Sequence, residues 1–195
     1  MKLFILCSRI WNYILLLCYR PLLKMRGSNV KFFPRNSIFS YSRIEIGSDV
    51  YIGPGAHFSS ICLIKIGNKV LFGPNVTIIT GDHRFDVIGK FMFDIKEKRK
   101  IDDQPVIIED DVWVGANVTI LKGVTVGRGS IIAANSLVIK EILPYTVNAG
   151  SPSKPLKLRW NIEDILEHEK VLYKTNKRYL KEVLLNLYSN TNLIR

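Results

Sequence analysis

Residues 108–143 read IEDDVWVGANVTILKGVTVGRGSIIAANSLVIKEIL, and an aliphatic residue returns at every sixth position of this stretch. The periodic residues are Ile108, Val114, Ile120, Val126, Ile132 and Val138. Four places after each comes a second set, mostly small or β-branched: Val112, Val118, Val124, Ser130, Ser136 and Ile142. A fixed short period predicts a stack of similar structural units.

The same period occurs earlier in the chain, in two runs separated by a shift of two residues. These runs are Ile46, Ile52 and Phe58, then Ile66, Phe72 and Ile78. Six residues do not match the period of a helix, but they suit a short extended segment followed by a corner. β-branched residues favour the extended part, and Gly, Asn and Asp favour the corner. We therefore expect stacked coils whose strands pair from one coil to the next, with the aliphatic residues inside.

Three stretches carry a family resemblance: FGPNVTIITGDH at 72–83, VWVGANVTILKGVTVG at 112–127, and NAGSPSKP at 148–155. Over about residues 40–160 the chain resembles the hexapeptide-repeat acyltransferases. It looks like the members that O-acetylate sugars of lipopolysaccharide or capsule, and like the maltose and xenobiotic acetyltransferase group. The resemblance implies an all-β fold, a left-handed parallel β-helix with three hexads per coil.

Length and composition narrow the class of protein further. A chain of 195 residues with 47% hydrophobic residues forms one domain with appendages. The three cysteines, Cys7, Cys18 and Cys62, show no paired spacing, which favours a reducing compartment over a disulfide framework. The net charge of +11 suits nucleic acid, an anionic membrane or a polyanionic cofactor. No nucleic-acid-binding motif is visible, so we expect no nucleic acid partner.

Residues 1–27 are apolar with basic residues between them, and they predict an N-terminal amphipathic helix. Arg9 and Asn12 interrupt the apolar run and Pro21 ends it, so it fits neither a signal peptide nor a membrane span. Two interpretations stay open. The helix contacts an anionic membrane peripherally, or it packs on the β-helix or on another subunit. We expect a cytoplasmic protein, either free or peripheral at the inner face of the cell membrane.

The remaining chain divides into the β-helix, residues 28–158, and a helical region, residues 159–195. Residues 80–105 break the repeat and predict a protruding loop, whose aromatic residues favour docking on an adjacent subunit. Asn161 is a helix cap with acidic residues after it, so we expect a C-terminal helical cap on the open end of the coil.

The chain has three histidines, His57, His83 and His168. The resemblance implies that His83, in TGDHRF before the loop, is the general base that deprotonates an acceptor hydroxyl. Asp82 and Asp86 are near it in sequence, but what orients its imidazole stays open. We expect no metal.

The resemblance also implies acetyl-CoA as the acyl donor. The positions matching its binding residues are Ala116, Ala134, Ile139, Lys140, Lys154 and Lys157. The alanines would leave room for the pantetheine arm. Ile139 and Lys140 would lie near the nucleotide end of the cofactor, and Lys154 and Lys157 would face its phosphates. Arg159 is a further candidate.

The acceptor side departs from the family pattern, which often places Asn in this region. The candidates here are His57, Ser59, Asn75, Asp82 and Trp113. Asn75 also suits a corner. Trp113 follows an inward valine and should point outward, which indicates a contact surface. The resemblance implies that this surface lies near the active site, between subunits. The resemblance implies a homotrimer with shared sites.

We therefore expect a CoA-dependent O-acetyltransferase acting on a sugar or glycan, in lipopolysaccharide or capsular polysaccharide synthesis. A maltose- or drug-type acceptor is the alternative. A γ-type carbonic anhydrase would need three zinc-binding histidines, but His168 falls in the C-terminal helical region, which leaves only His57 and His83. A non-catalytic scaffold would use the repeat without a general base or an acyl donor.

Overall fold

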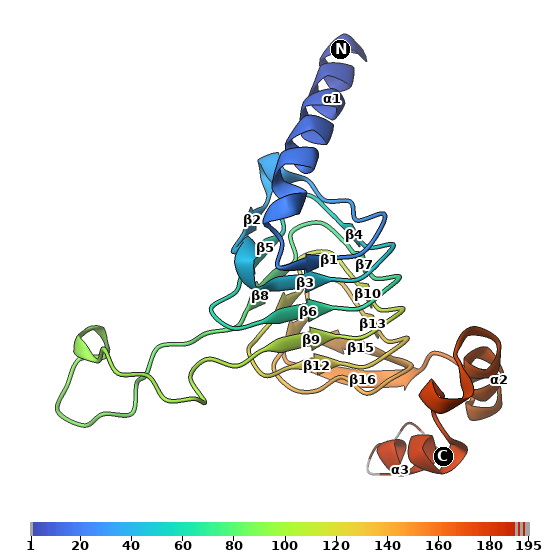
Figure 1. The fold of residues 1–195 in the computed structure, drawn as a ribbon. Coiled ribbons are helices and arrows are strands. Elements are labelled where there is room, and N and C mark those ends of the chain that lie inside the picture. The colour runs from blue at the N-terminus through green and yellow to red at the C-terminus, as the bar shows by residue number, and fades with distance from the viewer. Residues whose placement is uncertain (1, 190, 192, 194–195) are drawn as a thin grey trace.

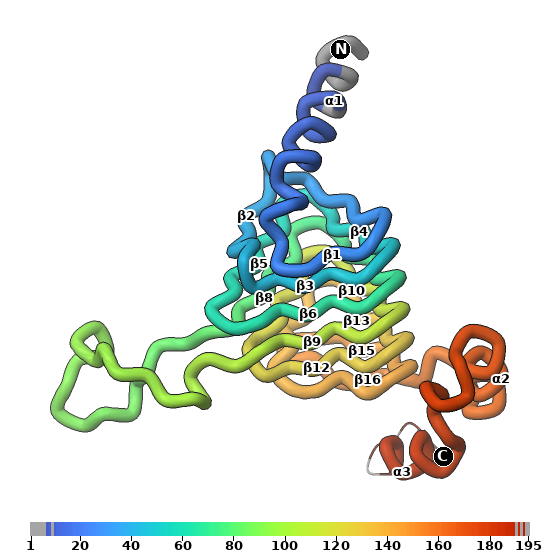
Figure 2. Tube along the Cα trace, viewed as in Figure 1, coloured from blue at the N-terminus to red at the C-terminus, as the bar shows by residue number. Residues whose placement is uncertain are grey.

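The computed structural model describes residues 2–189, 191 and 193, and the side chains among them except those of residues 2–6 and 9. Arg9, which the sequence places among the cations of the N-terminal segment, thus lies outside the described side chains. The chain forms a three-sided prism of stacked coils, with a helix at the N-terminal end, helices beside the C-terminal end and one long loop (Figures 1 and 2).

Three sheets make the sides of the prism. Sheet A contains β1 (Met25–Arg26), β3 (Ile44–Ile46), β6 (Ile64–Ile66), β9 (Val106–Ile108) and β12 (Thr125–Val126). Sheet B contains β4 (Tyr51–Ile52), β7 (Leu71–Phe72), β10 (Trp113–Val114), β13 (Ile131–Ile132), β15 (Thr146–Gly150) and β16 (Ser153–Leu158). Sheet C contains β2 (Ile38–Phe39), β5 (His57–Ser59), β8 (Thr77–Ile79), β11 (Thr119–Ile120) and β14 (Leu137–Val138).

Neighbouring strands within these sheets pair in parallel, apart from the antiparallel pair β15 and β16. The register stacks the periodic residues on one another, for example Ile66 on Ile108 and Ile108 on Val126. These side chains are buried, as are those four places later in the repeat. The parallel β-helix expected from the hexads is therefore confirmed, and the ladders of aliphatic residues form its core.

The corners depend on residues that adopt left-handed backbone. Asn75, Asn117 and Asn135 have φ near +60° and stack at one corner. Nδ2 of Asn75 donates to Oδ1 of Asn117 at 3.1 Å, and Asn117 donates likewise to Asn135 at 3.2 Å. Gly115 allows close approach of two coils, because a Cβ there would lie 2.6 Å from the backbone nitrogen of Ala134.

Helix α1 (Lys2–Tyr19) projects from the N-terminal end of the prism (Figure 1). It ends before Pro21, which has no amide hydrogen to continue the helix. Residues 20–27 therefore form the 3₁₀ turn η1 (Arg20–Leu22) and strand β1, although the sequence assigns them to the helix. None of the helices described by the structure combines the length and apolarity needed to cross a membrane.

The long loop leaves sheet C after β8 and returns at β9. It contains the 3₁₀ turn η4 (Met92–Asp94) and extends away from the prism (Figure 1). Most of its large apolar side chains are exposed: Phe85, Ile88, Phe91, Met92, Phe93 and Ile101. Two further 3₁₀ turns, η2 (Pro34–Asn36) and η3 (Tyr41–Arg43), belong to the first coil.

The C-terminal region contains α2 (Ile162–Leu172), η5 (Thr175–Lys177) and α3 (Lys181–Tyr188). Oδ1 of Asn161 caps α2 by accepting the amide of Asp164 at 2.8 Å. Both helices lie beside the last coils (Figure 1), while β16 forms the final edge of sheet B. The helices pack on Tyr145, whose hydroxyl donates to the buried carboxylate of Glu169. Burial, then this hydrogen bond, raises the pKa of Tyr145.

Candidate active site

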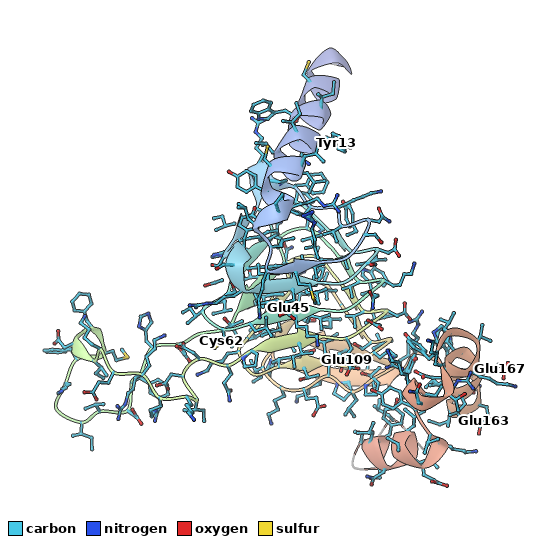
Figure 3. The ribbon with its side chains drawn as sticks, viewed as in Figure 1. Tyr13, Glu45, Cys62, Glu109, Glu163 and Glu167 are labelled. Atoms are coloured by element: carbon cyan, nitrogen blue, oxygen red, sulfur yellow. The ribbon has the colours of Figure 1, made fainter. Side chains whose placement is uncertain are left out.

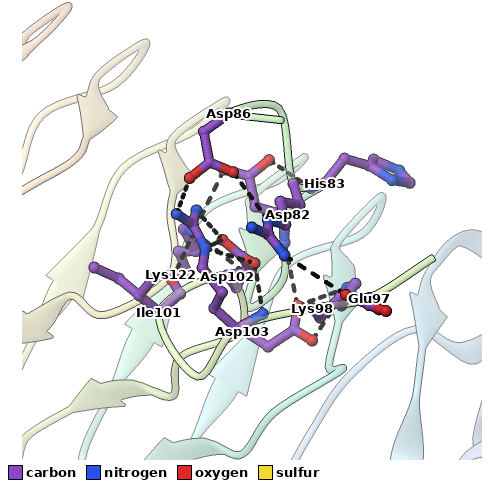
Figure 4. A network of polar contacts seen from close by, with 11 residues as sticks. Asp82, His83, Asp86, Glu97, Lys98, Ile101, Asp102, Asp103 and Lys122 are labelled. Atoms are coloured by element: carbon purple, nitrogen blue, oxygen red, sulfur yellow. Dashed lines mark hydrogen bonds and ion pairs between the residues drawn. The ribbon is translucent and has the colours of Figure 1, made fainter. Parts of the chain in front are cut away.

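His83 stands where the chain leaves the prism for the long loop. Its side chain is exposed, and Oδ1 of Asp82 accepts its backbone amide hydrogen at 2.9 Å. In Figure 4 the imidazole points away from the nearby carboxylates. Within the described part of the chain, no hydrogen bond reaches the ring. The histidine thus has a fixed backbone and a side chain free to meet a ligand.

The neck of the loop is held closed by backbone pairing. The amide of Gln104 donates to the carbonyl of Thr80 at 2.9 Å, and Gly81 forms an antiparallel bridge with Asp103. Nζ of Lys122, from the next coil, donates to the carbonyl oxygens of Ile101 and Asp102 at 2.9 and 3.1 Å. His83 therefore lies two residues from a rigid anchor.

Lys122 also approaches the residue that holds His83. Its Nζ lies 3.4 Å from Oδ2 of Asp82. Both residues line a cavity of about 270 Å³, together with Ile79, Leu121 and Ile139. Asp82 and Ile139 are predicted on separate grounds, one for the acceptor side and one for the donor side. The structure brings them into the same cavity.

A network of ion pairs joins the two ends of the long loop close to the prism. Arg99 binds the buried carboxylate of Asp102 at 2.7 Å and also pairs with Asp86, which accepts from Arg84 at 2.9 Å. The hydrogen bonds from Arg99 lower the pKa of Asp102 to about 2. Asp86, whose pKa is lowered chiefly by Arg84, therefore belongs to this network and does not bind the His83 ring.

The acceptor-side candidates occupy different places on the prism. His57 and Ser59 lie on β5, one coil before β8, in register with Thr77 and Ile79. His57 is exposed and Ser59 is half-buried, so both can be reached from the outer face of sheet C. Asn75 lies in the corner ladder, where its amide group already bonds to Asn117.

The donor-side candidates are spread along one end of the coil. Ala116 and Ala134 lie one coil apart at the corner between sheets B and C, where the Asn135 amide donates to the Ala116 carbonyl at 2.9 Å. Ile139 and Lys140 follow β14, at the corner where the loop leaves the prism in an earlier coil. Lys154 and Lys157 are exposed on β16. Small side chains followed by exposed cations fit an extended, anionic ligand such as CoA.

Trp113 points outward from sheet B, as expected, with 54% of its surface exposed. It stands between Leu71 and Ile131 on the neighbouring strands. His83, in contrast, follows sheet C. The chain places these two residues at different sides of the prism, so a site that used both would need a second copy.

Sequence reasoning missed the residues that hold the neck of the loop, above all Lys122, Asp102 and Arg99. The sequence around them does not mark these residues, because Lys122 is one lysine among many and the other two belong to a charged loop. Among the residues that the structure describes, no group of three or more His, Cys, Asp or Glu could hold a metal ion.

Comparisons with known proteins identify relatives that are named acetyltransferases. The family description "Bacterial transferase hexapeptide (six repeats)" matches residues 105–140. A probable macrolide acetyltransferase of Lysinibacillus sphaericus is 34% identical over 163 residues, covering 66% of this chain and 89% of the relative. The chain spans only 55% of a putative acetyltransferase from Schizosaccharomyces pombe and 56% of the galactoside O-acetyltransferase of Escherichia coli.

Solved structures show the same fold. A hexapeptide-repeat acetyltransferase from Vibrio cholerae in complex with acetyl-CoA superposes with a TM-score of 0.62 at 31% identity, over 73% of this chain and 74% of the other. A galactoside acetyltransferase in complex with coenzyme A gives a TM-score of 0.61 at 30% identity, covering 81% and 73%. The chain therefore belongs to the hexapeptide-repeat acyltransferase family.

Proposed function

We propose that this protein is an acetyl-CoA-dependent O-acetyltransferase in which His83 is the general base. One observation carries the proposal. The exposed imidazole of His83 follows Asp82, which accepts the backbone amide hydrogen of His83 and lines a cavity together with Ile139. Family membership supports the acyl-transfer chemistry, and the local geometry supports the choice of residue.

The proposed reaction needs only one proton carrier. The imidazole of His83 takes the proton from an acceptor hydroxyl, and the oxygen bonds to the carbonyl carbon of the thioester. The carbon–sulfur bond breaks, and the CoA thiolate leaves with the proton. Imidazole is the side chain best suited to take up and release a proton near neutral pH.

We assign the donor to the surface that runs from the cavity along the last coils. Ala116 and Ala134 would leave space for the pantetheine arm, and Lys140 and the two lysines of β16 would meet the nucleotide and its phosphates. Ile139 lines the cavity beside Asp82 and would lie nearer the thioester. The exposure of Ala134 and of these lysines supports this assignment.

For the acceptor we propose a sugar hydroxyl, in lipopolysaccharide or capsular polysaccharide synthesis. Similar structures include a maltose O-acetyltransferase from Clostridium difficile and an acetyltransferase described as specific for polySia. His57 and Ser59, reached from the outer face of sheet C, are the proposed hydroxyl-binding residues. Asp82 is better placed for holding His83 than for binding sugar.

We further propose that the protein acts as a homotrimer. Trp113 and His83 lie at different sides of one prism, so neighbouring copies could complete a site that neither holds alone. The exposed aromatic residues of the long loop also suit contact with an adjacent subunit.

The proposal is tested with acetyl-CoA and a panel of glycans, following free thiol release and product mass. His83→Ala is expected to lower kcat by about 10²–10⁴-fold. Coenzyme A binding, measured by calorimetry, should remain, because His83 is not assigned to the donor surface. Unchanged turnover in this variant refutes the assignment of the base. Absence of CoA binding in the folded wild-type protein refutes the function itself.

A further inference from the structure

The charge of this protein is concentrated at its N-terminal end. Residues 1–44 contain eight Lys or Arg and no Asp or Glu, and the first acidic residue is Glu45. The whole chain has a net charge of +11, so most of the excess lies in less than a quarter of its length. An anionic partner would therefore meet this end of the prism first.

Helix α1 presents an exposed apolar stripe. Ile10, Tyr13, Ile14 and Leu17 follow the spacing of one helical face, and each is 44–62% exposed. Beside the stripe, Trp11 is 52% exposed. The opposite face is attached to the first coil, where Leu16 is buried and Asn12 donates to the carbonyl of Phe32 at 3.4 Å. The stripe has no cover within the described chain.

Cations surround the base of this helix. Arg26, Lys31, Arg35 and Arg43 are exposed on the first coil. Among the described residues, an ion-pair partner is present only for Lys24 of this region, which lies 2.8 Å from Glu45. Figure 3 shows Tyr13 on the projecting helix and Glu45 on the prism. Apolar and aromatic side chains thus extend beyond a basic surface.

We propose that this end of the protein docks on an anionic lipid membrane surface. The stripe would enter the boundary between headgroups and acyl chains, where Trp and Tyr side chains are favoured. The exposed cations would meet lipid phosphates. The helix lies in or near the interface and does not span the bilayer. This proposal does not depend on which molecule accepts the acetyl group.

Charge favours lipid over a second copy of the chain as the occupant. Two copies that met through α1 would bring the basic residues of their N-terminal ends together. Like charges at close range oppose association. An anionic surface removes this repulsion.

The experiment measures co-sedimentation of the full chain with vesicles of phosphatidylcholine alone or with one-third phosphatidylglycerol. We expect binding to the anionic vesicles, weakened in high salt because salt screens exposed charges. The variant Lys31→Glu/Arg35→Glu should bind at least about thirty-fold more weakly. Lys174→Glu/Lys177→Glu changes net charge equally at the other end of the molecule, and it should bind almost as wild type.

The apolar surface of α1 is tested separately with Trp11→Glu, at the edge of the stripe, and Val171→Glu at an exposed position of α2 is its matched control. Circular dichroism verifies that each variant is folded, and light scattering gives its mass. Loss of vesicle binding in Trp11→Glu alone supports the proposal. Equal binding by the two charge variants, or no binding by wild type, overturns it. A fall in oligomer mass in Trp11→Glu also overturns it, because the stripe would then be a subunit interface.

Discussion

Nζ of Lys122 lies 3.4 Å from Oδ2 of Asp82, and Asp82 holds the backbone amide of His83. The same Nζ donates to two carbonyl oxygens at the returning end of the long loop. One amine from the next coil thus fixes both strands of the loop neck beside the proposed base. We interpret Lys122 as a positioning residue, since it acts on His83 through other groups.

The variant Lys122→Met should lower kcat by about tenfold or more with a smaller change in KM, because a displaced base costs rate more than binding. Lys122→Arg should retain more activity. Hydrogen exchange in residues 82–102 should rise in Lys122→Met. The matched control is Lys69→Met, which removes a corner lysine paired with Asp49 at 2.7 Å. Equal losses in both variants would show that Lys122 is merely structural.

Asp102 should make the stability of the protein depend on pH in acid. Its pKa is about 2 in the folded state, below the usual value of about 3.9 for an unfolded chain. The unfolded state therefore binds the proton more readily, so the stabilisation is present above about pH 4 and is lost as the pH falls towards 2. Urea unfolding between pH 2 and 6 should show a shallower pH dependence in Asp102→Asn than in wild type. The same pH dependence of unfolding in Asp102→Asn and wild type would exclude this role for Asp102.

Glu169 is fully buried and anchors the C-terminal helices. It accepts from Nη1 of Arg128 at 3.1 Å and from the Tyr145 hydroxyl. Glu169→Gln leaves the half-buried guanidinium of Arg128 without a carboxylate partner, which costs about 1–3 kcal/mol. We expect a lower Tm and faster proteolysis after residue 159. Glu167→Gln, in an exposed pair with Lys170, should cost less than about 1 kcal/mol. Similar effects of the two changes would contradict the anchoring role.

Ala134 tests the proposed donor surface. Its side chain is exposed, so Ala134→Phe should leave the fold and Tm near wild type while blocking the path of the pantetheine arm. We expect the Kd for coenzyme A, from calorimetry, to rise at least about tenfold, with glycan binding retained. An unchanged Kd in the folded variant would place the donor elsewhere on the prism.

The core and the strand order could be predicted because the repeat is local. Each hexad contains both an inward aliphatic residue and a corner residue, so the pattern specifies strand and turn together. Even the shift between Phe58 and Ile66 is absorbed at a single corner, and register resumes with Ile66 on Ile108. The end of α1 before Pro21 was less well predicted, because apolar residues continue beyond it.

The candidate site, like the fold, could be predicted only in part from the sequence. His83 was found because it lies inside a recognisable motif, and its role remains a prediction. Lys122 and Asp102 could not be found, because their importance arises from contacts between coils and across a loop. The contact of Lys122 with Asp82 joins residues 40 positions apart. No local pattern records such a contact.

The sequence by itself determined a stacked coil with an aliphatic interior, because a six-residue period can be satisfied only by burying every repeat against the next. Only the tertiary structure decided how the long loop is fastened, where the C-terminal helices lie, and that α1 presents an uncovered apolar stripe above a basic surface. These features depend on which side chains meet after the coil has closed, and short-range periodicity carries no information about that.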